Sequence, residues 1–184
     1  MRSMREELDK SAIADFDNTW KQALKLYFRA LLLFLFPEIH DIIDWKHHYI
    51  KLKTDLELTV NSQEPKGIAN QLFQARSKEG ESIFILISIE IDSKEDIDFI
   101  ESIHYYNCRA VGQYKRPVIS LGILADRGKS WRSRKYKYAK GKYKKTMEFP
   151  IAKLVDYQSR WEELEASTNP FAIAVSSQRS AVSL

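Results

Sequence analysis

Two acidic residues close an apolar stretch in the middle of this 184-residue chain, and their spacing could support chemistry. The stretch runs from Ser82 to Asp92 and reads SIFILISIEID, a composition typical of a strand buried on both faces. Side chains two apart on a strand project from the same face, so Glu90 and Asp92 are expected side by side. Buried carboxylates need compensation, usually from a divalent metal ion; the alternative is that the strand simply ends there and its acids reach water.

The flanking segments predict the elements that would position these acids. Residues 68–76 are expected to form a strand, 77–80 a tight polar turn, and 81–92 the partner strand of a hairpin. A helix is then predicted from Glu95 to about Tyr114, followed by a second buried strand over 117–124. The expected buried face of that helix, which would make the single cysteine a small core residue, is Ile97, Ile100, His104, Cys108, Val111 and Tyr114.

Further elements are expected on both sides of this unit. The spacing of Thr19 and Gln22 matches a capping box, which predicts a helix that ends before Pro37. We expect a short helix over 39–45, extended structure over 49–60, a loop over 61–67, and a strand over 147–155 with Pro150 at an edge. Strands and helices in this order predict an α/β fold.

Composition excludes several classes of protein. Hydrophobic residues make up 44% of the chain, which rules out wholesale disorder, and a lone cysteine cannot form an intrachain disulfide. The charged N-terminus shows no secretory signal and the apolar run over 30–36 is too short to cross a bilayer. We therefore expect a soluble, cytoplasmic protein without a membrane partner. The four histidines lack zinc-ligand spacing, and no glycine-rich phosphate loop is present.

The segment from Arg127 to Lys145 holds ten Lys or Arg and no acid, whereas the rest of the chain has a net charge of −6. Tryptophan and tyrosine residues are interleaved with these cations. Cations bind phosphates and rings stack on exposed bases, so the segment suits a nucleic acid; a solvated loop or hairpin is the alternative. The candidate DNA-binding residues are Arg109, Arg127, Lys129, Arg132, Arg134, Lys135, Lys137, Lys140 and Lys142. Together with an acid-tipped strand, they fit metal-assisted phosphodiester hydrolysis.

A series of short motifs extends from about residue 15 to 175. They are WKQAL at 20–24, FPEIH at 36–40, IDW at 43–45, LISIEI at 86–91, YNCR at 106–109, RPVISL at 116–121, LAD at 124–126 and LEASTNPFA at 164–172. In this order the chain resembles the PD-(D/E)XK nuclease family transposases, which include the recombination-promoting nucleases. The resemblance implies a restriction-endonuclease-like mixed β-sheet core flanked by helices, and a Mg²⁺-dependent DNA endonuclease linked to mobile elements, with a homodimer as a possible assembly.

Composition and the resemblance together predict a domain organisation. Residues 1–14 are polar with weak periodicity and are expected to form a flexible N-terminal arm, and 176–184 are expected to form a polar tail. The resemblance implies that 15–175 form the nuclease-like domain. Family members usually continue with a helical region after the segment that contains Asn169 and Phe171, so the chain is expected to be truncated at its C-terminus.

The catalytic residues that the resemblance implies are Asn70, Glu90, Asp92 and Gln22, the first three as metal ligands. Asn70 stands where the family has an aspartate, Asp92 where it has a glutamine or lysine, and Gln22 where a glutamate is common. An amide brings one oxygen but no charge, although the Glu90–Asp92 pair keeps two carboxylates. Gln22 could instead only complete the capping box, and Asn70 could bond a neighbouring backbone. Two hypotheses follow: a nuclease of weak or lost activity, and a non-catalytic DNA-binding relic of the fold.

Overall fold

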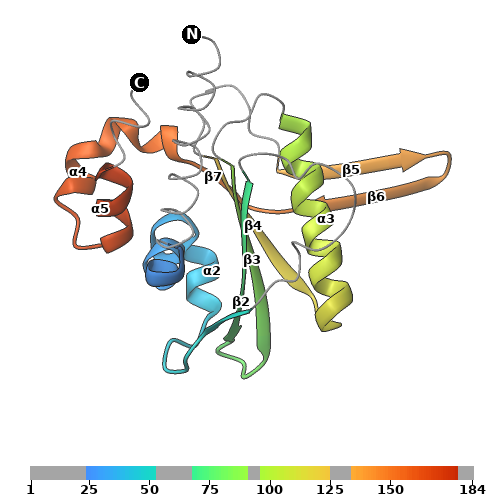
Figure 1. The fold of residues 1–184 in the computed structure, drawn as a ribbon, viewed down its shortest axis with the longest axis horizontal. Helices are drawn as coiled ribbons and strands as arrows, with labels where there is room; N and C mark the ends of the chain where they lie inside the picture. Colours follow the sequence, from blue (N-terminus) through green and yellow to red (C-terminus); the bar gives the residue numbers. More distant parts are fainter. Residues whose placement is uncertain (1–23, 53–67, 91–95, 125–133, 178–184) are drawn as a thin grey trace, which may run out of the picture.

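The computed structural model describes residues 24–52, 68–90, 96–124 and 134–177 (Figure 1). Five strands form one mixed sheet in the order β1-β2-β3-β4-β7, and two more form the separate β5–β6 hairpin. The sheet strands are β1 (Ile50–Leu52), β2 (Ile68–Arg76), β3 (Ser82–Glu90), β4 (Val118–Leu124) and β7 (Ile151–Lys153). The hairpin strands are β5 (Lys135–Lys140) and β6 (Tyr143–Glu148). The helices are a first helix over residues 24–35, α2 (Pro37–Ile42), α3 (Asp96–Tyr114), η2 (Leu154–Arg160), α4 (Trp161–Glu165) and α5 (Pro170–Ser177).

The antiparallel pair β2–β3 occupies the middle of the sheet, as predicted. The turn between them is closed by a hydrogen bond from the Gly80 amide to the Ser77 carbonyl oxygen at 3.0 Å. Gly80 has a φ of +92°, a conformation that a residue without a Cβ adopts at little cost. The Ser77 hydroxyl also accepts a hydrogen bond from the Glu81 amide at 3.1 Å, which holds the start of β3 against the end of β2.

Strand β3 is buried on both faces because a strand lies on each side of it and helices cover both faces of the sheet. It pairs in parallel with β4 after the α3 crossover, and β4 pairs in parallel with β7. Figure 1 shows α3 on one face of the sheet and the first helix with α2 on the other. A mixed α/β fold with a five-stranded sheet flanked by helices is thus confirmed, and the predicted order strand, strand, helix, strand is present.

The larger part of the core lies between the sheet and the first helix. Leu24, Phe28, Leu31 and Leu32 are fully buried there. Phe28 stacks on Phe73 of β2 with ring centroids 4.1 Å apart. The C-terminal helices join the same core through residues that include Leu164, Phe171 and Ala172.

Asn169 ties α5 to the first helix. Its Oδ1 accepts hydrogen bonds from the amides of Phe171 and Ala172, which satisfies donors at the start of α5. Its Nδ2 donates to the carbonyl oxygen of Ala30 in the first helix at 2.9 Å. One side chain therefore caps a helix and fixes its position against a segment far away in sequence.

Three local predictions were wrong. The strand expected over 147–155 is divided into β6 and β7 by Phe149 and Pro150, because proline cannot donate a ladder hydrogen bond, and the 3₁₀-helix η2 begins at Leu154. The short helix begins at Pro37, a residue suited to a first helical turn, and ends at Ile42. On α3, Cys108 and Val111 are exposed; the buried face contains Phe99, Ile103, Tyr106 and Ala110.

The remaining expectations concern membrane spans, the chain ends and two of the site residues. None of the helices in the described ranges has both the length and the apolar character needed to span a bilayer. The N-terminal arm over 1–14 lies outside the described residues, as do Gln22, Asp92 and residues 178–184 of the expected tail. Residues 176 and 177 form the last turn of α5.

Candidate functional site

Asn70, the first of the predicted site residues, lies in β2 directly opposite Ser88 of β3. The buried Ser88 hydroxyl donates a hydrogen bond to Asn70 Oδ1 at 2.6 Å. Leu72 and Leu86 are each two residues away, from Asn70 and Ser88 respectively, and therefore lie on the same face of the sheet. They pack with Tyr106 of α3, so Asn70 and Ser88 are on the α3 side of the sheet. Asn70 thus bonds a side chain of the neighbouring strand. An amide oxygen has two lone pairs, so this bond leaves capacity for another contact.

Glu90 is the last residue of β3, and its backbone position belongs to a row that crosses four strands. Glu90 is paired with Ile68 on one side and with Leu124 on the other, and Leu124 is paired with Lys153. Neighbouring strands lie about 4.8 Å apart, so the backbones of positions 90 and 153 are separated by roughly 10 Å. The side chain of Glu90 lies outside the described part of the structure, and the convergence of Asn70, Glu90, Asp92 and Gln22 stays a prediction.

Lys153 was not among the predicted site residues. It ends β7 and is only 3% exposed. Lysine is rarely buried to this extent, and Lys153 has an interaction partner within the protein. Its backbone position in the row of Glu90 places a second ionisable residue at this end of the sheet. The sequence held a weak signal, because Lys153 is a single charge inside the apolar run from Ile151 to Val155. Its alignment with Glu90 depends on pairing between strands that are distant in sequence.

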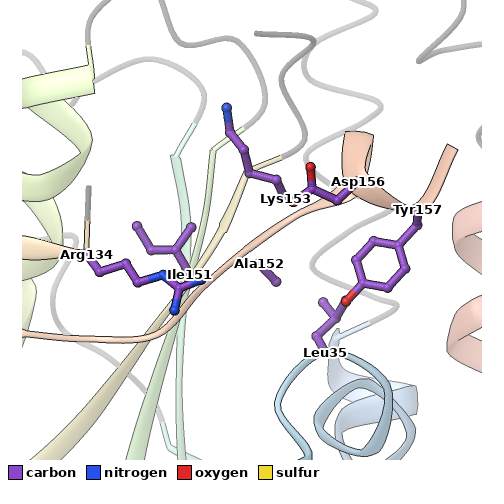
Figure 2. Close-up of a pocket in the computed structure, with 7 residues that line it drawn as sticks. All are labelled: Leu35, Arg134, Ile151, Ala152, Lys153, Asp156 and Tyr157. Carbon is purple, nitrogen blue, oxygen red and sulfur yellow. The ribbon is translucent and has the colours of Figure 1, made fainter. Parts of the chain in front are cut away.

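A cavity of about 250 Å³ lies beside β7 (Figure 2). Arg134 and Tyr157 approach it from either side of Ile151 and Ala152. Burial, with the nearby Asp156 carboxylate, raises the pKa of the Tyr157 hydroxyl above its ordinary value, so the hydroxyl is protonated at neutral pH. The full lining is Leu35, Arg134, Ile151, Ala152, Lys153, Asp156 and Tyr157.

The described part of the basic segment forms the β5–β6 hairpin, which extends beyond α3 and away from the sheet (Figure 1). Its two-residue turn is Gly141-Lys142, with a φ of +59° at Gly141 only, which matches the hairpin turn that places glycine first. Residues 134–148 carry seven Lys or Arg and one acid, Glu148. The Lys135 ammonium pairs with the Glu148 carboxylate at 2.6 Å, near the base of the hairpin. The distal part of the hairpin is therefore strongly positive.

The base of the hairpin packs on α3, which provides the support that an isolated two-stranded hairpin lacks. Tyr136 stacks on His104 with centroids 3.9 Å apart and ring planes 18° apart. The Phe149 amide donates to the Arg134 carbonyl oxygen at 3.0 Å and closes the base. Burial and, to a lesser extent, the Lys145 ammonium lower the pKa of His104, so its imidazole is mainly neutral at pH 7. The helix face predicted to be core thus carries the hairpin at His104.

The structure brings together only some of the predicted DNA-binding residues. Arg109 lies on α3, where its guanidinium group is 5.6 Å from the centroid of the Tyr105 ring. Arg127, Lys129 and Arg132 lie outside the described residues. The hairpin and its base carry the remaining predicted residues: Arg134, Lys135, Lys137, Lys140 and Lys142.

The donor atoms near Asn70 show whether this site suits the expected Mg²⁺ ion. Within the described ranges, no three His, Cys, Asp or Glu side chains lie close enough to hold a metal ion. Asn70 supplies a hard oxygen ligand of the kind Mg²⁺ accepts, but a neutral one that already accepts a hydrogen bond. The donor type therefore fits, whereas the negative charge would have to come from Glu90 and Asp92.

Comparisons with known proteins do not assign the chain to a family. No family model, curated protein or solved structure matches it.

Proposed function

We propose that this protein binds DNA through the β5–β6 hairpin and carries a nuclease-like site whose activity is weak or lost. The observation that supports DNA binding most strongly is the charge of the hairpin, a net +6 over residues 134–148 in a chain whose total is +4. Phosphate neutralisation by such cations releases counterions and supplies most of the affinity in sequence-independent DNA binding. The hairpin also projects beyond α3 and away from the sheet (Figure 1).

Salt titration with matched charge variants tests this proposal. We expect the unmodified chain to bind duplex DNA without marked sequence preference, with an affinity that falls steeply as salt rises. Replacing Lys137, Lys140 and Lys142 by glutamine should reduce the slope of log K against log salt by up to about 3. The control replaces Lys25, Lys46 and Lys78, which are exposed cations outside the hairpin, and should retain the original slope. Equal effects of the two triple variants would contradict the proposal.

Metal-dependent phosphodiester hydrolysis is the second candidate function, favoured by the position of Glu90 at the end of the central strand β3 near the Asn70–Ser88 pair. Glu90 and Asp92 would hold Mg²⁺, with Asn70 as a neutral ligand. When bound, the ion would polarise the phosphate and activate water. The hydroxyl of Ser88 would orient Asn70, and Lys153 would add a positive charge in the same row.

Restoring the missing charge tests the second candidate. The unmodified chain should nick supercoiled plasmid slowly or not at all with Mg²⁺. Asn70→Asp should increase Mg²⁺-dependent nicking about tenfold or more, because it adds a charged ligand to which Ser88 can still donate. Asn70→Ala is the control, since it removes the oxygen and should show no increase. Brisk cleavage by the unmodified chain that Glu90→Ala abolishes would show that the site is fully active.

A further inference from the structure

The two faces of the β5–β6 hairpin differ in a way that its charge alone does not reveal. Pairing places Tyr138 opposite Lys145, and Lys140 opposite Tyr143. Partners directly opposite each other in an antiparallel pair project from the same face, so these four side chains form one patch near the tip. The rings occupy one diagonal of the patch and the ammonium groups the other. We call this patch the tyrosine face.

The rings of the tyrosine face are available to a ligand. Tyr138 is 45% exposed and Tyr143 is 59% exposed. Their centroids lie 6.0 Å apart with ring planes at 64°, so each ring contacts the other through an edge and does not cover it by stacking. By contrast, Tyr136 at the base of the same strand is stacked on His104 and only partly exposed. Two large rings exposed on a projecting hairpin contribute little to the core of the domain.

The opposite face of the hairpin carries cations without rings. Lys137 is paired with Thr146 there, and Ala139 with Lys144. Both faces can therefore contact phosphates, and only the tyrosine face can also stack. On that face Lys145 is positioned from below, because its ammonium group donates to Cys108 Sγ of α3 at 3.7 Å.

We propose that the tyrosine face binds unpaired bases of DNA, with Tyr138 and Tyr143 as stacking platforms and Lys140 and Lys145 on the flanking phosphates. This inference rests on the proposed DNA binding and names the class of DNA that the hairpin prefers. In a duplex the base faces are covered by their neighbours, so the rings would have nothing to stack on. In a single strand every base offers a π-face, and cations placed beside the rings match a ligand that alternates bases with phosphates.

The first experiment compares three ligands with the full chain. Fluorescence anisotropy would measure binding of oligothymidylate, of an abasic oligonucleotide of equal length and charge, and of a duplex of the same length. We expect oligothymidylate to bind about tenfold or more tightly than the abasic strand, from base–ring stacking. The ratio should persist at higher salt, because stacking releases no counterions.

Variants then locate the effect on the tyrosine face. Replacing both Tyr138 and Tyr143 by leucine should bring the ratio of the two single-strand affinities close to one, since leucine keeps apolar bulk but offers no aromatic ring. Tyr143→Trp should increase the ratio, because the tryptophan ring is larger than the tyrosine ring. This variant keeps an aromatic ring at the position, so it tests stacking even if the double leucine variant disturbs the hairpin. The matched control, Lys137→Gln with Lys144→Gln, removes charge from the face without rings and should lower both affinities alike.

The outcomes separate the two proposals. Equal affinity for oligothymidylate and the abasic strand, with both bound, overturns the tyrosine-face inference and leaves the hairpin as a phosphate contact. A ratio that the leucine variants do not change also overturns it, because the stacking must then occur elsewhere. Absence of binding to all three ligands overturns the proposed function itself.

Discussion

Strand β3 and strand β5 both contact α3, yet they differ in how they contribute to the molecule. From Phe84 to Ile89 every residue of β3 is buried. The neighbouring strands β2 and β4 form hydrogen bonds with its backbone on both sides. In β5 only Tyr136 is partly buried, and the other residues are exposed. The sheet thus supplies stability, whereas the hairpin adds little to stability and is free to carry cations and rings. Binding function is expected where a strand is not needed for the core.

The same kind of substitution in both regions gives the largest test of this contrast. Phe73 is fully buried and stacked on Phe28, so Phe73→Ala should lower the free energy of unfolding by about 3–5 kcal/mol. Tyr143→Ala removes a ring of similar size from an exposed position and should cost less than about 1 kcal/mol. Urea denaturation followed by circular dichroism measures both values. Similar losses for the two variants would mean that the hairpin is part of the cooperative core.

Glycine substitutions in the sheet and in the hairpin should give stability losses of intermediate size. A Cβ on Gly122 of β4 would lie 3.0 Å from Ile151 Cγ1 and 3.2 Å from Ile103 Cδ1, so Gly122→Ala should destabilise the whole domain by about 1–3 kcal/mol. Gly141 has open space around it but a φ of +59°, so Gly141→Ala strains only the turn, by about 1 kcal/mol. Thermal unfolding should respond to the first variant, and amide exchange within the hairpin to the second. A lower melting temperature for Gly141→Ala than for Gly122→Ala would contradict this assignment.

A smaller effect is expected where the two regions meet. Burial lowers the pKa of His104, so the folded protein binds this proton less readily than the unfolded chain, whose histidine has a pKa of about 6.5. The contribution to stability is therefore present above that value and is lost as pH falls through the lowered pKa. His104→Gln should make the unfolding midpoint less sensitive to pH between about 7.5 and 5.5. A variant with the same pH dependence as the unmodified chain would show that folding does not lower the pKa of His104.

The central elements could be predicted because their local signals agree. Alternation in β2, a polar turn at Ser77–Gly80 and a change to helical periodicity after β3 define the hairpin and α3 within a few residues. The buried face of α3 could not be predicted from periodicity, because the helix contacts two partners. Ile103 faces the sheet and His104 faces the hairpin, which leaves Cys108 exposed where a single apolar face would have buried it.

The candidate site was less predictable than the fold. Asn70 was identified from the motif pattern, but its partner Ser88 follows from the register of two strands, and Lys153 joins the row of Glu90 only through β4. Such long-range pairing leaves little trace in local composition. The hairpin has a local signal, because lysine and tyrosine alternate on both sides of Gly141. Once the register is known, this alternation assigns the rings to one face of the hairpin and leaves the other face without rings.

Removing the hairpin tests most directly whether it is the DNA-binding surface. Tyr136 and Met147 are paired at the base of the hairpin and pack on the core beneath α3, so residues 137–146 beyond them can be replaced by an Asn-Gly turn with little change to the sheet. We predict that the shortened protein retains a cooperative unfolding transition and the far-ultraviolet circular dichroism of a folded α/β domain, and loses binding to duplex and single-stranded DNA. A folded, shortened protein that binds DNA with the original affinity and salt dependence would contradict the account.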